Sequence, residues 1–178
     1  MQSTQPSSGS AVREVPGRDI RAGRYALLLI VVLTAVNLVL LLTDNGQYFL
    51  FSASVPYYLT FLALGLDNGF TPLRWSEIGR LTKAALGISV GTLAVYLLFW
   101  LLSRKRPGWL LGALVLFVLD TAALVGLSFL LVGKPWMDPM DLFLHIWAIV
   151  ELGKAVAAHS RSKKAPPKDP GDGTLMNN

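Results

Sequence analysis

Long stretches without charge constrain this chain more than any other feature. Residues 25–43 (YALLLIVVLTAVNLVLLLT) contain no charged side chain, and as a helix they extend roughly 28 Å, close to the hydrocarbon thickness of a bilayer. Only 15% of the 178 residues are charged, against about a quarter in a soluble domain. We therefore expect lipid to solvate most of the chain. A cleaved signal peptide is disfavoured for this first run, because the run is long and no small-residue cleavage site follows Thr43 directly.

Lysine and arginine decide which apolar segments cross the membrane, because near helix ends they stay on the cytoplasmic side. Spans at about 25–43, 84–102, 109–132 and 140–158 would leave only Arg74, Arg80, Lys83 and Lys134 outside. A further span at 48–66 would divide the basic residues eight to eight. We therefore predict an all-α protein with four transmembrane helices in an antiparallel bundle and both termini inside. The basic residues then inside are Arg13, Arg18, Arg21, Arg24, Arg104, Lys105, Arg106, Lys154, Arg161, Lys163, Lys164 and Lys168.

The segment between the first two spans, residues 44–83, is expected to cap the outer face. Its first half is dense in aromatic residues, which favour the membrane interface, while Ser52, Ser54 and Pro56 interrupt an early helix. Pro56 suits a first helical turn. We therefore predict a short, aromatic-rich interfacial helix on the extracytoplasmic side, from about Pro56 to Gly65.

A second helix is predicted in the same cap. Thr71 and Pro72 follow the pattern of an N-cap residue with proline at the first helical position. This helix is expected to run through Trp75, Ile78 and Leu81 into the span at residue 84. Outside the membrane body, residues 1–23 and 159–178 lack apolar periodicity and are predicted to be flexible cytoplasmic tails, the second of them basic.

Three apolar segments resemble matching stretches of small, uncharacterised integral membrane proteins of Gram-positive bacteria. The segments are YFLFSASVPYYL, GWLLGALVLFVLDT and LHIWAIVELGKAV. The resemblance covers about residues 25–158 and rests on the order of aromatic residues and on the aspartate of the third span. It implies a multi-pass protein of the bacterial cytoplasmic membrane. It carries no assigned activity and transfers no catalytic residue.

Asp120 is the most informative polar residue, because it lies near the middle of the third span. A charge there costs at least about 2.5 to 3.5 kcal/mol, so the side chain is expected to face protein. An ion or proton relay is one interpretation, and an interhelical hydrogen bond that fixes packing is the favoured one. A pair within the last span, Glu151 with Lys154, explains those two charges without a function. The predicted polar cluster comprises Asn37, Tyr96, Asp120, His145, Glu151 and Lys154.

The sequence gives only weak evidence for metal binding or catalysis. Asp138, Asp141 and His145 lie on one helical face and are weak candidates for metal ligands, but Asp138 before Pro139 also reads as an N-cap. A serine with a histidine at similar depth would be needed for intramembrane proteolysis, and Ser128 with His145 is the pair that we consider. The chain has no cysteine, so thiol chemistry is excluded. We predict no catalytic residue, no metal and no cofactor.

Small residues suggest close helix packing at two places. Gly87 and Gly91 in the second span, and Gly108 and Gly112 at the start of the third, have the spacing that lets membrane helices approach closely. We expect packing within the bundle, with homodimerisation as the alternative.

These features favour a non-enzymatic membrane protein, an accessory or interaction subunit that packs against another membrane component or itself. A small proton, ion or solute transporter using Asp120 is the alternative. Expected partners are the bilayer, with anionic headgroups at the cytoplasmic face, and a membrane protein or a second copy of the chain, but no nucleic acid.

Overall fold

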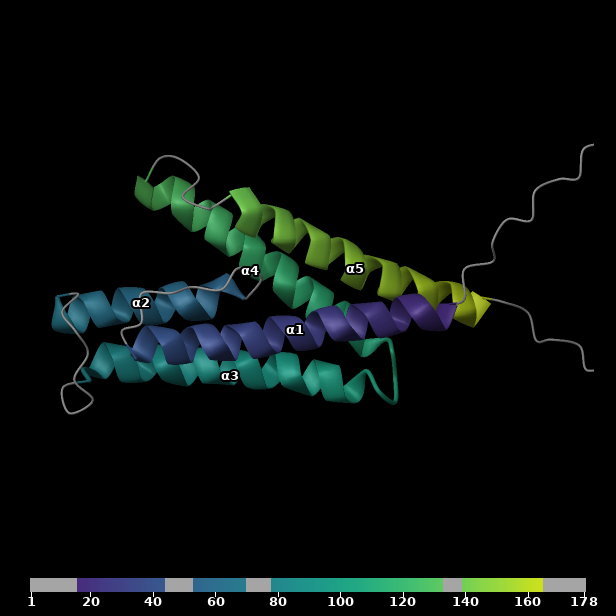
Figure 1. The fold of residues 1–178 in the computed structure, drawn as a ribbon, viewed down its shortest axis with the longest axis horizontal. Helices are drawn as coiled ribbons and strands as arrows, with labels where there is room; N and C mark the ends of the chain where they lie inside the picture. Colours follow the sequence, from purple (N-terminus) through teal and green to yellow (C-terminus); the bar gives the residue numbers. More distant parts are fainter. Residues whose placement is uncertain (1–15, 44–52, 70–77, 133–138, 165–178) are drawn as a thin grey trace, which may run out of the picture.

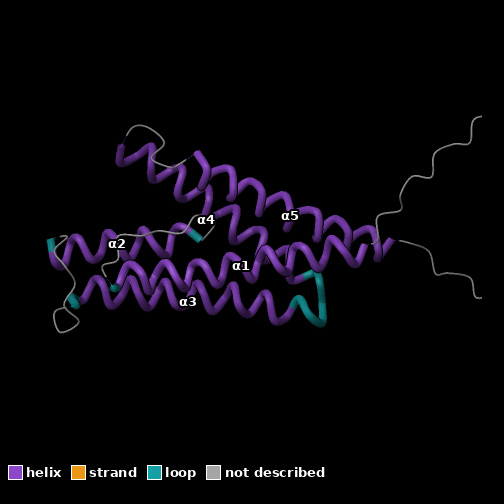
Figure 2. The backbone as a smooth tube through the Cα atoms, in the orientation of Figure 1, coloured by secondary structure: helices purple, strands orange, loops and turns teal. Residues whose placement is uncertain are grey.

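The computed structural model describes residues 16–43, 53–69, 78–132 and 139–164, and their regular structure is entirely helical (Figure 2). Four helices are long and apolar enough to cross a membrane, which confirms the predicted all-helical class with four candidate spans. The third candidate span, Trp109–Gly126, lies within the predicted residues 109–132. The five helices in chain order are α1 (Pro16–Leu42), α2 (Ser54–Asn68), α3 (Arg80–Leu102), α4 (Trp109–Val132) and α5 (Pro139–Lys164).

Helices α1 and α5 lie side by side, and α1 begins beside the end of α5 (Figure 1). Small residues make this approach close: a Cβ atom at Gly23 would lie 2.5 Å from the Cβ of Ala155. At the same end, Arg161 Nη2 lies 3.9 Å from Asp19 Oδ2. The apolar core between the helices is built from Leu27, Ile30, Val31, Ala53, Tyr96, Leu110, Ala113, Phe117, Ala148, Leu152 and Ala155.

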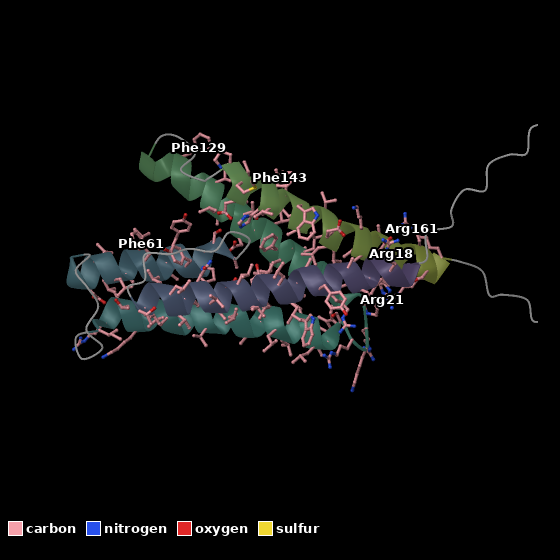
Figure 3. The ribbon with its side chains drawn as sticks, viewed as in Figure 1. Arg18, Arg21, Phe61, Phe129, Phe143 and Arg161 are labelled. Atoms are coloured by element: carbon pink, nitrogen blue, oxygen red, sulfur yellow. The ribbon has the colours of Figure 1, made fainter. Side chains whose placement is uncertain are left out.

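The start of α1 and the end of α5 correct the predicted bounds of the tails. Helix α1 begins at Pro16 and α5 continues to Lys164, so residues 16–23 and 159–164 are helical. Proline fits the first helical position, and an acidic residue in the first turn of α1 and basic residues in the last turn of α5 complement the helix dipoles. Figure 3 shows the labelled basic side chains gathered at this end: Arg18, Arg21 and Arg161.

Helix α2 runs alongside α1 and α3 (Figure 1). It exceeds the predicted range of about 56–65 at both ends. Its start lies level with the centre of the uncharged run 25–43, because the N–H of Ala53 donates to Thr34 Oγ1 at 2.8 Å. Its last turn reaches the start of α3. The short aromatic helix thus begins among the long helices and ends at one end of them.

The start of α3 differs from the prediction. Ile78 and Gly79 are not helical, and α3 begins at Arg80, so no helix continues from Trp75 into the span; residues 70–77, with Thr71 and Pro72, lie outside the described ranges. The reason is a carboxylate of α2 that caps the start of α3. Asp67 of α2 accepts hydrogen bonds from Thr82 N at 2.7 Å and from Thr82 Oγ1 at 2.8 Å. A Cβ at Gly79 would overlap the Asp67 carboxylate, and the Thr82 donors lower the pKa of Asp67.

Candidate functional site: a buried polar network at the start of helix α2

A carboxylate from α4 caps the N-terminus of α2. Asp120 Oδ2 accepts the Ser54 N–H at 2.8 Å, and Oδ1 accepts the Val55 N–H at 3.0 Å. The residue at the N-cap position, Ala53, has no side-chain acceptor of its own. A helix start carries unpaired N–H groups and the positive end of the helix dipole, so an anion held there satisfies both.

A second branch of the network leads from α2 to α5. Ser54 Oγ lies 3.1 Å from His145 Nε2, and His145 Nδ1 lies 2.8 Å from the carbonyl oxygen of Asp141 and 3.3 Å from its Oδ1. A carbonyl only accepts, so Nδ1 carries a proton, and in the neutral ring the Ser54 hydroxyl donates to Nε2. The Phe117 ring stacks on the imidazole with centroids 5.2 Å apart and holds its plane.

Further hydrogen bonds with Thr34 of α1 and Ser89 of α3 fix the first turns of α2. Thr34 receives the Ala53 N–H and donates its own hydroxyl to Ile30 O at 2.7 Å. The hydroxyls of Thr60 in α2 and Ser89 in α3 both donate to Pro56 O at 2.9 Å. Side chains of α1, α3, α4 and α5 therefore all form hydrogen bonds with the start or the first half of α2.

The order Ser54, His145, Asp141 resembles the nucleophile, base and orienting carboxylate of serine hydrolases in its geometry. Two observations limit this chemistry. Ser54 and His145 have no exposed surface. The N–H groups of Ser54 and Val55, which would stabilise an oxyanion, already bind the Asp120 carboxylate. The arrangement holds α2, α4 and α5 together at the start of α2.

The structure divides the predicted polar cluster. It joins Asp120 and His145 through Ser54. Tyr96 and Asn37 are fully buried. Glu151 and Lys154 pair with each other at 2.9 Å on α5. The spacing of these two residues had favoured such a pair within one helix.

The weak metal candidates do not assemble into a site. Asp141 and His145 contact each other within α5, and Asp138 lies outside the described residues. Within the described part of the chain, no three acidic or histidine side chains converge on a common point. The side chain of Ser128, considered with His145 for proteolysis, is also not described.

The two glycine pairs behave differently. A Cβ at Gly112 would lie 2.8 Å from the Phe99 ring, and one at Gly108 would lie 3.5 Å from His159 Nε2, so this pair packs within the chain. At Gly87 and Gly91, no atom of the described residues outside the local helix backbone lies within 4 Å of the Cβ position. The prediction that they pack within the bundle is therefore wrong for Gly87 and Gly91.

Sequence reasoning missed Ser54 and the cap that it shares with Val55. Ser54 was interpreted as an interruption of the helix, whereas it is the first helical residue. One signal pointed to the correct answer: a lone aspartate in the middle of a span requires several donors, and a serine two residues before a proline marks a helix start that can supply them.

The four apolar helices with this buried network place the chain in the class of multi-pass membrane proteins. No family model, no curated protein and no solved structure matches it.

The cap predicts a ranked loss of stability. Asp120→Asn leaves one acceptor for two N–H donors and should lower the free energy of unfolding by about 1 to 3 kcal/mol, the cost of an unpaired buried group. Ser54→Ala removes a neutral hydrogen bond and should cost about 0.6 kcal/mol. The measurement is unfolding in mixed micelles by titration with sodium dodecyl sulfate.

Thr121→Ala is the matched control, because Thr121 bonds only the carbonyl of Phe117 in its own helix. Its effect should stay within about 0.5 kcal/mol. An Asp120→Asn protein as stable as this control would contradict the assignment of Asp120 as the cap.

Proposed function

We propose that the protein is a non-enzymatic interaction subunit of the bacterial cytoplasmic membrane, with both termini in the cytoplasm and its four spans in an antiparallel bundle. It packs through the outward face of α3 against another membrane protein or a second copy. The observation that carries this proposal is the exposure of Gly87 and Gly91: among the described residues, no atom outside the local helix backbone lies within 4 Å of either Cβ position.

The outward face of α3 suits a helix partner. Ala84, Gly87 and Gly91 are exposed at spacings of three and four residues, so they form one small-residue face. The buried residues of α3 are only Thr82, Ala85, Ser89 and Tyr96 among those described. In lipid, helices associate by close van der Waals contact rather than by the hydrophobic effect, and small residues permit that contact.

Helix α2 is inferred to enter the outer leaflet instead of lying flat on its surface. Its start is level with Thr34, at the centre of the first apolar run. Backbone N–H groups at that depth require protein partners, and Asp120 and Thr34 supply them. Its aromatic side chains then lie between the mid-plane and the extracytoplasmic interface.

The association face predicts a selective loss of complex formation. Gly87→Ile with Gly91→Ile should abolish most of the homo-oligomer or partner recovered by cross-linking in membranes, because the branched side chains keep the helices apart. Gly126→Ile is the matched control, since this glycine of α4 is also exposed with no atom within 4 Å. A monodisperse monomer in mild detergent, with no partner retained after cross-linking of the wild type, would refute the proposal.

The orientation predicts opposite labelling of two exposed cations. The chain lacks cysteine, so Arg80→Cys and Lys105→Cys each introduce a single thiol. In intact cells a membrane-impermeant maleimide should label the cysteine at position 80, and it should label the one at position 105 only after permeabilisation. Labelling of position 105 in intact cells would reverse the orientation.

A transporter is the second candidate, and one observation favours it. Discontinuous helices that start at mid-membrane form substrate or ion sites in many transporters, and α2 starts at the depth of Asp120. The interaction subunit is preferred because both Asp120 oxygens already accept hydrogen bonds and only 6% of the residue is exposed.

Flux measurements separate the two functions. If Asp120 carries ions or protons, wild-type proteoliposomes should exceed empty vesicles in proton or cation flux, and Asp120→Asn should return the flux to that level. Folding of both preparations is checked by gel filtration first. Wild-type flux equal to that of empty vesicles would remove the transporter candidate.

A further inference from the structure

A basic pocket lies where the α3–α4 turn meets the last turns of α5. Its volume is about 440 Å³, and three cations line it: Lys105, Arg106 and Lys163. No carboxylate is among its lining residues, and within the described part of the chain none of the three cations forms an ion pair. The neighbouring Arg104 is engaged differently, because its guanidinium lies 4.5 Å from the centre of the Trp100 ring.

The turn that carries two of these cations is held by its own backbone. Arg104 N donates to Leu101 O, Lys105 N and Arg106 N donate to Leu102 O, and Trp109 N donates to Arg106 O, all at 3.0 to 3.1 Å. The wall of the pocket that this turn forms is therefore ordered by backbone hydrogen bonds. His159, Pro107 and Gly108 complete its lining with Trp109.

An apolar groove continues from this pocket along the surface between α3 and α4. It measures about 540 Å³ and is lined by α3 and α4, from Phe99 to Val95 and from Trp109 to Leu119. The two cavities share Gly108 and Trp109. At 1.5 Å per residue, the α4 side of the groove is about 15 Å long, or half the hydrocarbon thickness. Its floor at Gly112 has no side chain, and the Phe99 ring lies against that position.

We propose that these joined cavities bind one anionic phospholipid, with the phosphate headgroup on Lys105, Arg106 and Lys163 and an acyl chain in the groove of α3 and α4. The charges complement an anionic headgroup, and basic pockets between helices at the cytoplasmic face recognise such lipids. Trp109 lies at the junction of the two parts, where an interfacial aromatic is expected. A free phosphate would use the pocket alone, so the groove selects a lipid.

The site does not depend on the proposed interaction function, because Ala84, Gly87 and Gly91 are not among its lining residues, and its α3 residues, Val95 and Phe99, lie farther along the helix towards the α3–α4 turn. It requires only that this end of the molecule lies at a leaflet surface. Loss of the protein partner would leave lipid binding intact, and loss of lipid binding would leave association through α3 to be tested on its own.

Lipid titration of the purified full-length protein tests the proposal. Dioctanoyl phosphatidylglycerol, dioctanoyl phosphatidylcholine and glycerol phosphate are titrated into the protein in a nonionic detergent, and bound molecules are counted by native mass spectrometry. We expect a saturable single site for phosphatidylglycerol, at least tenfold weaker binding of phosphatidylcholine, and no binding of glycerol phosphate. Equal binding of the two lipids, or binding of glycerol phosphate as tight as that of phosphatidylglycerol, would overturn the lipid site.

Variants of the pocket separate it from general charge attraction. Arg106→Gln with Lys163→Gln should weaken phosphatidylglycerol about tenfold to thirtyfold, since each cation near an anionic lipid contributes about a fivefold change. Arg18→Gln with Arg21→Gln removes the same charge from α1 at the same end and should change affinity less than threefold. Equal weakening by both double variants would overturn the pocket.

Variants of the groove test the acyl chain with charge held constant. Val115→Trp fills the groove and should abolish binding of phosphatidylglycerol. Val118→Trp is its control: Val118 is 40% exposed, against 50% for Val115, and lies outside the groove lining. Wild-type affinity in Val115→Trp, or the same loss in both tryptophan variants, would overturn the groove as part of the site.

Discussion

The hydrogen bonds from Ser54 and Val55 to Asp120 are the interaction on which the rest of this structure depends. A helix that begins inside a membrane exposes N–H groups that lipid cannot satisfy, together with the positive end of its dipole. A carboxylate is the one side chain that can accept two such bonds and also supply a compensating charge. The same contact removes the penalty of an aspartate at mid-span. Each group would be costly alone, and together they define where α2 starts.

The carboxylate caps formed by Asp67 and Asp120 show that the structural effect of such a cap depends on how deeply it is buried. Asp67 caps α3 near one end of the candidate span Arg80–Leu102, and its pKa is lowered by the Thr82 donors. Asp67 is itself partly exposed, so water is an alternative partner for its carboxylate, and this cap adjusts the geometry of a turn. Asp120 lies among buried side chains, where no such alternative exists. The deep cap therefore specifies the fold, whereas the shallow one refines the junction between α2 and α3.

The sequence was sufficient for the elements governed by local composition. Uncharged runs predicted the four candidate spans, and Pro56 with its aromatic neighbours predicted a short helix between the first two. The contacts of Asp120 could not be predicted, because its partners lie 65 and 66 residues away and are backbone groups of any residue type. The His145 link to Ser54 spans 91 residues. Composition therefore identified a residue that needs partners, and only the packing of α2 identified which ones.

The glycine pairs and the basic turn also show that residues in the same sequence pattern can make different contacts in the structure. Gly87 with Gly91 and Gly108 with Gly112 have the same spacing, yet among the described residues only the second pair packs against side chains of other elements. Arg104, Lys105 and Arg106 are consecutive, and all three count toward the positive-inside asymmetry that the sequence predicts. Arg104 stacks on Trp100, while its two neighbours line the basic pocket. Because successive residues of a tight turn point in different directions, one charge cluster can orient the protein and still leave two cations facing a single ligand.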